Sequence, residues 1–494
     1  MEREDNVLRA EKRRKLRELR NKGINPFPYS YQKTHHVSEV RKQWGETLKA
    51  GEKVDTSVSL AGRVMTLRSM GKASFFNIQD QTGSLQIYFR NEELPASMVD
   101  AFLLMDIGDI VGIKGFVFKT QKGELTVHAQ HFELLTKTLE PLPEKYHGLQ
   151  DIELKYRYRH LDLIADPQSR KVFETRSRLI YEIRQWMVQQ GFMEVETPIL
   201  QPIYGGAAAH PFETYHRALD RKLYLKISPE LYLKRLIVGG FEKVFEIGKN
   251  FRNEGIDRTH NPEFTMMEWY EAYTDYFFQM ERFESLVTYL VEKLCGSTKI
   301  RFQGTEIDFK RPWRRLKVLD GVREYSGIDP DRASLEDLRQ RLRELQSEWA
   351  SDDDKLHRLT WGELVMEIFE LTAEPHLVQP TIVMDHPVEI SPLTKRHRQD
   401  PRLVERFEPF VAGMEIGNSY SELNDPEEQY ERLKEQEAKR IIDDEAHPMD
   451  LDFIHAIDVG MPPTGGVGLG IERLVMLITD QPSIRDIILF PTLR

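Results

Sequence analysis

Residues 243–273 read KVFEIGKNFRNEGIDRTHNPEFTMMEWYEAY. Two strand-like runs flank a polar segment at 255–263, which predicts a long β-hairpin. Because side chains alternate along a strand, the second run presents one face made of Phe264, Met266, Glu268 and Tyr270. Arg252 and Glu254 share a face on the first run. A guanidinium, an aromatic ring and a carboxylate placed together suit ATP, although a solvated surface hairpin would show the same pattern.

A second glycine-rich stretch lies near the C-terminus, where residues 465–478 read GGVGLGIERLVMLI. The glycines precede an apolar helix that carries Arg473 near its start. Free backbone N–H groups at a helix start, together with an arginine, can bind an anion. The stretch lacks the lysine pattern of a Walker phosphate loop, and glycine-rich helix starts are common.

Residues 57–135 form short alternating strands with a helix-like stretch at 92–105 after the third, which is the order of an OB-fold barrel. Strand alternation buries Phe76 and turns Phe75 and Gln86 outward. An exposed phenylalanine is unremarkable alone, but on this barrel face it favours stacking on unpaired nucleic-acid bases.

The rest of the chain divides around that barrel. Residues 1–56 are predicted to be a basic N-terminal helical extension, whose first helix ends at Gly23 and is either a solvated surface or an RNA contact. Residues 136–149 carry two prolines and form the predicted linker. Residues 150–494 form one large domain of mixed helices and strands.

Composition limits the class of protein. The chain has 494 residues, 40% of them hydrophobic, and a net charge of −11, so a polyanion would have to be held by local basic patches. The single cysteine, Cys295, excludes an intramolecular disulfide framework. No apolar run is long enough for a membrane span and the first 20 residues are too charged for a signal peptide, so we expect a cytoplasmic protein without a membrane partner.

Three motifs in order resemble those of the class II aminoacyl-tRNA synthetases. They are a helix, strand and proline at 180–200, FRNE with HNPEFTMMEWY at 251–270, and GLGIERL at 468–474. The N-terminal OB-fold resembles the aspartate, asparagine and lysine subgroup. The segments PIYGGAAAHPF, ISPELYLKRLIVGG and EIGNSYSELNDP are similar to those of its bacterial lysine-specific members, and the resemblance covers nearly the whole chain.

The resemblance implies an α+β fold, with an OB-fold barrel that binds the anticodon and a catalytic domain built on an antiparallel sheet flanked by helices. It implies a homodimer whose first motif forms the interface. The implied reaction activates L-lysine with ATP to lysyl-adenylate and transfers the lysyl group to the 3′ end of tRNA(Lys), with Mg²⁺ as cofactor.

The resemblance also implies roles for residues at matching positions. The implied catalytic residues are Arg252 and Arg473. The implied ATP contacts are Arg252, Glu254, His260, Phe264 and Arg473. The implied lysine pocket is Gly206, Glu230, Arg252, Glu268, Tyr270, Asn418, Tyr420 and Glu422. The implied magnesium ligands are Glu408 and Glu415, and the implied anticodon contacts are Arg68, Phe75, Gln86 and Glu124.

The stretch FEPFVAGMEIG at 407–417 supports Glu408 and Glu415 as a pair of magnesium ligands independently of the resemblance. A tight turn at 412–413 would pair Phe410 with Glu415 and place Glu408 diagonally across from Glu415 on the same face. Hard carboxylate oxygens on a phosphate-binding face suit Mg²⁺. Taken alone, two exposed strand carboxylates explain the same residues.

The candidate residues that follow Glu415 do not alternate with it as they would on one regular strand. Asn418, Tyr420 and Glu422 differ in parity from Glu415, so a regular strand would turn them away from it. We therefore expect a bulge near Gly417.

Charge predicts the choice of substrate. Glu230 and Glu422 suit the two ammonium groups of lysine, whereas an acidic substrate would need a cation at Glu422. Two rival interpretations remain: a catalytically silent RNA-binding relative, and a ligase that attaches lysine to a protein. The presence of Arg252 and Arg473 argues against the first, and the barrel argues against the second.

Overall fold

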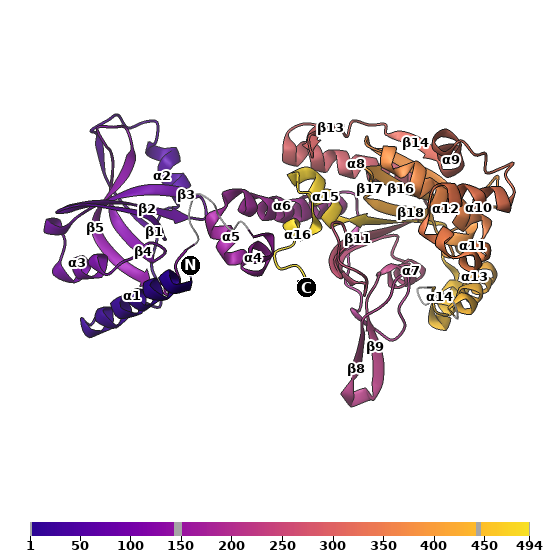
Figure 1. The fold of residues 1–494 in the computed structure, drawn as a ribbon, viewed down its shortest axis with the longest axis horizontal. Helices are drawn as coiled ribbons and strands as arrows, with labels where there is room; N and C mark the ends of the chain where they lie inside the picture. The colour runs from indigo at the N-terminus through magenta and orange to yellow at the C-terminus, as the bar shows by residue number, and fades with distance from the viewer. Residues whose placement is uncertain (1, 143–150, 441–445, 494) are drawn as a thin grey trace. The chain divides into compact units, whose positions relative to one another are not determined.

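The computed structural model describes residues 2–142, 151–440 and 446–493. The chain divides into two compact units, Met1–Leu149 and Gln150–Arg494 (Figure 1). Each unit has its own hydrophobic core. Within the described part of the chain, every helix is too short or too polar to cross a lipid bilayer. Of the predicted linker, residues 143–149 lie outside the described residues.

The first unit is a closed barrel with the strand order β1-β2-β3-β5-β4. Its strands are β1 (Lys53–Met70), β2 (Ala73–Asp80), β3 (Gly83–Arg90), β4 (Ile110–Lys119) and β5 (Leu125–Thr136). Its helices are α1 (Glu2–Asn21), α2 (Val37–Trp44), η1 (Asn91–Glu93) and α3 (Ala96–Leu103). The predicted OB-fold barrel is confirmed, with the helix between the third and fourth strands.

The residues before the barrel are part of its core. Leu19 of α1 and Val37 and Val40 of α2 are fully buried with the barrel side chains. The ammonium of Lys12 donates to the backbone oxygen of Ile107 at 3.2 Å and to Oγ1 of Thr138 at 3.1 Å. The predicted basic helix is therefore present, but one side of it is packed rather than solvated.

The second unit is built on a sheet with the order β14-β15-β16-β18-β19-β11-β10-β6. The pairs β14–β15 and β10–β6 are parallel and the other pairs on this path are antiparallel. The strands of this sheet are β6 (Met193–Glu194), β10 (Lys243–Phe251), β11 (Glu263–Ala272), β14 (Arg314–Lys317), β15 (Thr381–Pro387), β16 (Leu403–Val411), β17 (Met414–Glu415), β18 (Gly417–Ser421) and β19 (Thr464–Gly470).

Helices flank this sheet, as expected for the α+β fold. They are α4 (Ile152–Arg157), α5 (Arg159–Ala165), α6 (Pro167–Gln189), α7 (Glu230–Val238), α8 (Tyr276–Cys295), α9 (Val318–Ser326), α10 (Leu335–Glu344), α11 (Asp353–Arg358), α12 (Trp361–Thr372), α13 (Pro426–Lys439), α14 (Leu451–Gly460), α15 (Ile471–Thr479) and α16 (Ile484–Ile487). Short 3₁₀ turns occur at η2 (Arg217–Leu219), η3 (Glu348–Ser351), η4 (Glu374–His376) and η5 (Val388–Ile390). Small separate sheets are formed by β7 (Leu200–Gln201), β8 (Glu213–His216) and β9 (Arg221–Leu225), and by β12 (Lys299–Phe302) and β13 (Thr305–Asp308).

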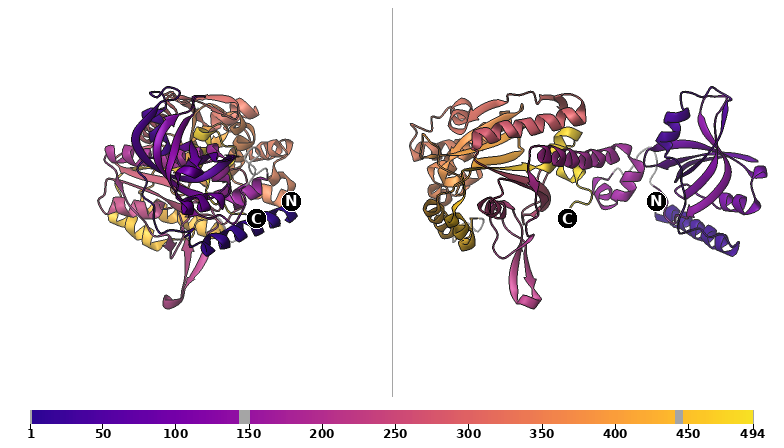
Figure 2. Two further views of the ribbon diagram at one scale, coloured as in Figure 1. Left: turned by 90° about the vertical axis from the view of Figure 1, so that its left-hand side faces the viewer. Right: turned by 180° about the vertical axis from the view of Figure 1, so that it is seen from behind.

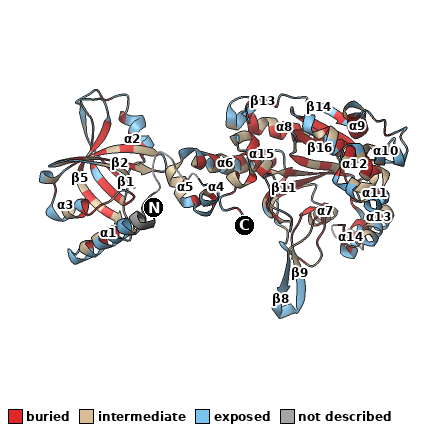
Figure 3. Cartoon of the chain, viewed as in Figure 1, coloured by how far each residue is buried: buried red, intermediate tan, exposed pale blue. Residues whose placement is uncertain are grey.

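One face of the main sheet is closed by helices. Trp269 of β11 packs with Phe283 of α8 and Leu474 of α15 in a core that also includes α6. Figure 3 shows buried stretches of the main sheet and of the helices beside it in red, against the exposed hairpin of β8 and β9, which also projects from the unit in Figure 2. Because side chains alternate, the residues between those core positions on β11 point to the opposite face.

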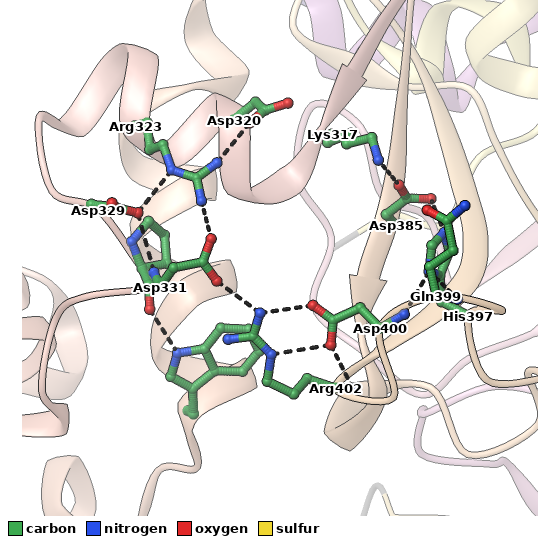
Figure 4. Close-up of polar contacts among 12 residues, drawn as sticks. Lys317, Asp320, Arg323, Asp329, Asp331, Asp385, His397, Gln399, Asp400 and Arg402 are labelled. Carbon is green, nitrogen blue, oxygen red and sulfur yellow. Dashed lines mark hydrogen bonds and ion pairs between the residues drawn. The ribbon is translucent and has the colours of Figure 1, made fainter.

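A polar network holds the loop that leads into β16 (Figure 4). Arg402, just before β16, donates to Oδ1 of Asp331 and Oδ2 of Asp400, both at 2.7 Å. Arg323 of α9 donates to Oδ1 of Asp329 at 2.8 Å and also pairs with Asp331. The network thus ties the start of the strand that carries Glu408 to the segment after α9.

Candidate active site

The predicted hairpin is confirmed as β10 and β11, which pair in a regular antiparallel register from Lys243 opposite Glu271 to Phe251 opposite Glu263. Arg252 follows β10 directly, and its backbone N–H donates to the oxygen of Pro262 at 2.9 Å. The candidate ATP and lysine residues of β11 thus lie on the face of the sheet opposite to α8 and α15, and Arg252 and Glu254 follow the end of β10 beside them.

A cavity of about 400 Å³ lies on this face, within the usual size of small-molecule sites. Its lining includes all but one of the candidate catalytic-domain residues: Gly206, Glu230, Arg252, Glu254, His260, Phe264, Glu268, Tyr270, Glu408, Glu415, Asn418, Tyr420 and Arg473. The exception is Glu422, which is buried behind the wall. A Cβ atom on the lining residue Gly466 would overlap Oε1 of Glu422, so only glycine fits there.

Arg252, Arg473 and the ring of Phe264 line one part of the cavity. The guanidinium of Arg252 lies over the ring of Phe264, 5.2 Å from its centroid. Burial lowers the pKa of Arg252, and the carboxylates of Glu254, Glu415 and Glu268 oppose that shift. His260 lies with Nδ1 2.7 Å from Oδ2 of Asp257. This part of the wall offers positive charge and a flat apolar surface.

The candidate metal ligands Glu408 and Glu415 lie on either side of the predicted hairpin turn. Ala412 and Gly413 both have positive φ, 54° and 70°, and the turn pairs Phe410 with Glu415 as expected. Arg406 pairs with Glu408, and Nε2 of His386 lies 3.5 Å from its Oε2. Burial alone would raise the pKa of Glu408, but Arg406, and after it the contact with His386, lower it to about 2.

Glu415 differs from Glu408 in charge environment. Burial and the charge of Glu408 raise the pKa of Glu415, and Arg473 opposes the rise. No cluster of three or more acidic, histidine or cysteine side chains suited to a metal occurs among the described residues. Two carboxylates on a cavity that is also lined by Arg252 and Arg473 nevertheless fit Mg²⁺, which commonly takes its remaining ligands from water and substrate phosphates.

The predicted bulge near Gly417 is confirmed by the strand register. Phe410 pairs with Glu415, but Phe407 pairs with Ser419, which is one residue further along than a regular ladder allows. Ile416 lies at the break between β17 and β18. The shift brings Asn418 and Tyr420 into the same cavity wall as Glu415.

The other part of the wall is acidic and hydrogen-bonded. Glu268 accepts from Oγ of Ser228 at 2.8 Å and from the hydroxyl of Tyr270 at 3.1 Å. Burial and the nearby charge of Glu230 raise the pKa of Glu268 to about 8. The hydroxyl of Tyr420 donates to Oε2 of Glu230 at 2.6 Å.

Close backbone approach shapes this acidic wall. Gly206 has a φ of +86°, and a Cβ there would lie 2.7 Å from Oγ of Ser228 and 2.8 Å from Cβ of Glu230. Both the conformation and the space therefore require glycine.

The sequence analysis did not identify several residues that contact the site. Ser228 and Arg406 hold Glu268 and Glu408, and Lys234 pairs with both Glu230 and Glu422. The i, i+4 spacing of Glu230 and Lys234 on α7 is a signal that could have identified that ion pair. Arg406 and Glu408 are two residues apart on β16 and share one face of it, which is also a local signal. The pairing of Glu422 with Lys234 had none, because Lys234 lies on α7, far away in the sequence.

The barrel shows the predicted strand alternation. Phe76 is buried, whereas Phe75 is partly exposed and its ring centroid lies 5.0 Å from that of Tyr88. Arg68 is exposed and pairs with Phe75 in the β1–β2 register. Oε1 of Gln86 accepts from Oγ1 of Thr126 at 2.9 Å.

The aromatic face is larger than the sequence predicted. Rings of Phe116, Phe118 and His128 continue it from Tyr88 across β4 and β5. Glu124, the remaining anticodon candidate, is exposed just before β5.

Comparison with known proteins agrees with this architecture. Residues 58–135 match the family described as the OB-fold nucleic acid binding domain, and residues 151–494 match the tRNA synthetases class II (D, K and N). The chain is 51% identical to the lysine–tRNA ligase of Carboxydothermus hydrogenoformans, over 97% of this chain and 96% of that protein. It is 48% identical to that of Moorella thermoacetica, over 99% and 98%, and 50% identical to that of Methanoculleus marisnigri, over 97% and 94%. With the family model covering its whole second unit, the chain belongs to the class II tRNA synthetases of the D, K and N group.

Proposed function

We propose that this chain activates L-lysine with ATP to lysyl-adenylate and transfers the lysyl group to the 3′ end of tRNA(Lys). The observation that carries the proposal is a single cavity lined both by Arg252, Phe264 and Arg473 and by the buried carboxylates Glu230 and Glu268. The first set suits a nucleoside triphosphate and the second suits ammonium groups. Relatives named lysine–tRNA ligase, 48% to 51% identical over nearly the whole chain, support the same reaction.

In the proposed first step, an oxygen of the lysine carboxylate attacks the α-phosphorus of ATP, and the bond from that phosphorus to pyrophosphate breaks. Arg252 stabilises the charge that develops on the α-phosphate, and Arg473 and His260 contact the phosphates that leave. Phe264 stacks on adenine, and Glu254 binds the nucleotide beside it. Glu408 and Glu415 fit Mg²⁺, which when bound supplies further positive charge at the phosphate oxygens. Positioning and electrostatics provide the rate, with no nucleophilic side chain.

Lysine is held in this step by the acidic wall. The buried carboxylates Glu230, Glu268 and Glu422 bind its two ammonium groups, and Arg252 binds its carboxylate. The remaining contacts in the proposed pocket are Gly206, Tyr270, Asn418 and Tyr420.

In the proposed second step, a hydroxyl of the terminal tRNA ribose attacks the carbonyl carbon of the adenylate, and AMP leaves. The barrel selects the tRNA by stacking unpaired anticodon bases on Phe75. Arg68, Gln86 and Glu124 provide polar contacts around that ring. Base stacking on an aromatic side chain is tolerant of sequence, so the polar neighbours supply the discrimination.

The proposal includes a homodimer in the cytoplasm, where tRNA, ATP and free lysine are available together. Its support is that Met193, Ile199 and Leu200 of the first motif are apolar side chains exposed in the single chain. Exposed apolar side chains in contiguous segments are typical of protein interfaces.

The test is lysine-dependent exchange of pyrophosphate into ATP, measured with and without tRNA, followed by charging of tRNA with labelled lysine. We expect exchange with lysine alone, no exchange with aspartate or asparagine, and charging of tRNA(Lys). Absence of exchange in the folded protein would indicate a catalytically silent relative. Exchange without tRNA charging would indicate another lysine acceptor.

A further inference from the structure

A lysine of the chain itself is buried beside the proposed amino-acid pocket. Lys234 lies one turn after Glu230 on α7, and its side chain is completely buried. Its ammonium donates to Oε1 of Glu230 at 2.6 Å and forms an ion pair with Oε2 of Glu422. The cavity lining does not include Lys234, so it lies behind the carboxylate that faces the ligand.

The surroundings favour the charged form of this side chain. The ammonium lies 5.4 Å from the ring centroid of Tyr420 and 5.8 Å from that of Phe453. Burial opposes ionisation, but Glu230 and Glu422 together raise the pKa of Lys234. Burial lowers the pKa of the neighbouring His447 to about 4, so this imidazole adds no positive charge near neutral pH.

The charges around Lys234 do not balance without a ligand. Glu230 and Glu422 provide two carboxylates, and Lys234 provides one ammonium. Both oxygens of Glu230 already have donors, from Lys234 and Tyr420, whereas Oε1 of Glu422 has no hydrogen-bond donor. Burial and the charge of Glu230 therefore raise the pKa of Glu422 well above its ordinary value although Lys234 opposes the rise, and a second cation beside Glu422 would favour its charged form.

We propose that Lys234 is a specificity-determining residue, because its ammonium neutralises one of the carboxylates Glu230 and Glu422 and leaves the pocket one net negative charge for the substrate side chain. The inference rests on the proposed lysine activation. One surplus negative charge matches the single ammonium on a lysine side chain. A neutral side chain would leave the charge buried and uncompensated, and an acidic side chain would add a second one.

The charges on the α-carboxylate and α-ammonium of the substrate have other partners in the pocket. The α-carboxylate of lysine can pair with Arg252, and its α-ammonium can pair with Glu268, both of which line the cavity. With lysine bound, each carboxylate in the pocket then has one cation.

The test uses a charge-balance series in the pyrophosphate exchange assay. Glu422→Gln leaves Glu230 paired with Lys234 and the pocket without net charge, so we expect the KM for lysine to rise roughly 10- to 100-fold. Adding Lys234→Met to Glu422→Gln restores one negative charge and frees Glu230. We therefore expect the double variant to bind lysine about tenfold or more tightly than Glu422→Gln, with the KM for ATP unchanged in both.

If Lys234 had only a structural role, the double variant would give the opposite result. If Lys234 only holds α7 in place, removing it impairs the Glu422→Gln protein further, and a KM for lysine equal to or above that of the single variant overturns the inference. Should the double variant fail to fold, Lys234→Gln with Glu422→Gln has the same charge and keeps a hydrogen-bond donor, with the same expectation. Lys222→Met, which removes an exposed lysine paired with Glu213, is the matched control and should leave the KM unchanged.

Failure of the proposed function is distinguishable from failure of this inference. Lack of lysine-dependent exchange in the parent protein would contradict the function itself. With an active parent, thermal melting gives a second readout: Lys234→Met leaves two buried carboxylates facing each other, so its melting temperature should fall and added lysine should raise it more than in the parent. A parental melting temperature for Lys234→Met would contradict the ion pairs on which the inference depends.

Discussion

Arg473 holds Glu415 through two contacts, since its Nη1 lies 2.6 Å from the backbone oxygen and 3.1 Å from Oε2 of that residue. Its Nη2 lies 3.4 Å from Nε2 of His260. The first turn of α15 is thereby joined to β17 and to the loop between β10 and β11. A proposed triphosphate contact and a proposed metal ligand are direct neighbours, so metal and phosphates would occupy the same part of the cavity.

Glu415→Gln should raise the magnesium concentration needed for half-maximal pyrophosphate exchange. The amide is a weaker ligand for a hard cation than the carboxylate, and Arg473 also loses its charged partner. A magnesium titration at saturating ATP and lysine measures the change, and a chelator should abolish exchange in the parent. Glu213→Gln on the exposed hairpin is the control; the same magnesium requirement in both variants would contradict the assignment of Glu415.

Arg252→Ala should slow adenylate formation by about 10²–10³ while the protein stays folded, because a positioned cation is lost from the reacting phosphate. Exchange kinetics and circular dichroism measure the two effects. Arg217→Ala, an exposed arginine between β8 and β9, should exchange at the parental rate. Near-parental exchange in a folded Arg252→Ala protein would remove Arg252 from the proposed mechanism.

The kcat/KM for lysine should rise as the pH approaches the pKa of Glu268, which burial and the charge of Glu230 raise to about 8. Below that pH the carboxyl is mostly protonated, and the α-ammonium of lysine binds the ionised form, so kcat/KM for lysine should increase from pH 6.5 to about 8. Glu268→Gln should flatten this part of the profile. A parent profile that falls over the same range would contradict the role of Glu268.

The raised pKa of Glu268 also predicts that the folded protein becomes less stable as the pH rises, while its use of lysine improves. The folded protein binds the Glu268 proton more tightly than the unfolded chain does, since the ordinary pKa of a glutamate is 4.5. The stabilising effect is fully present below that unfolded value and is lost as the pH rises through about 8. The melting temperature of the parent should therefore fall more over this range than that of Glu268→Gln.

Phe75→Ala and Phe76→Ala should separate the two faces of the barrel. Phe75→Ala should lose a base-stacking contact of about 1–3 kcal/mol, which raises the KM for tRNA and leaves lysine activation unchanged. Phe76→Ala removes a buried ring and should destabilise the barrel by about 3–5 kcal/mol. Thermal melting and aminoacylation measure both variants, and an unfolded barrel in Phe75→Ala alone would contradict the observed burial of these two residues.

Much of the site could be predicted because its signals are local. The alternation that buries Phe76 and exposes Phe75, and the face of β11 shared by Phe264, Glu268 and Tyr270, follow from side-chain direction along a strand. The turn at Ala412 and Gly413 and the bulge after Glu415 follow from the spacing of residues within one short stretch.

The sequence by itself determined which side chains share a strand face, where the turns fall and which chemical groups the cavity contains, because these depend on neighbours along the chain. Only the tertiary structure decided that Lys234 pairs with Glu422 and that Leu19 of the basic helix completes the barrel core. These partners are distant in sequence and become neighbours only through strand order and helix packing. Their pairing depends on burial, which raises the energetic cost of an unpaired charge or an exposed apolar side chain until a partner from elsewhere in the fold satisfies it.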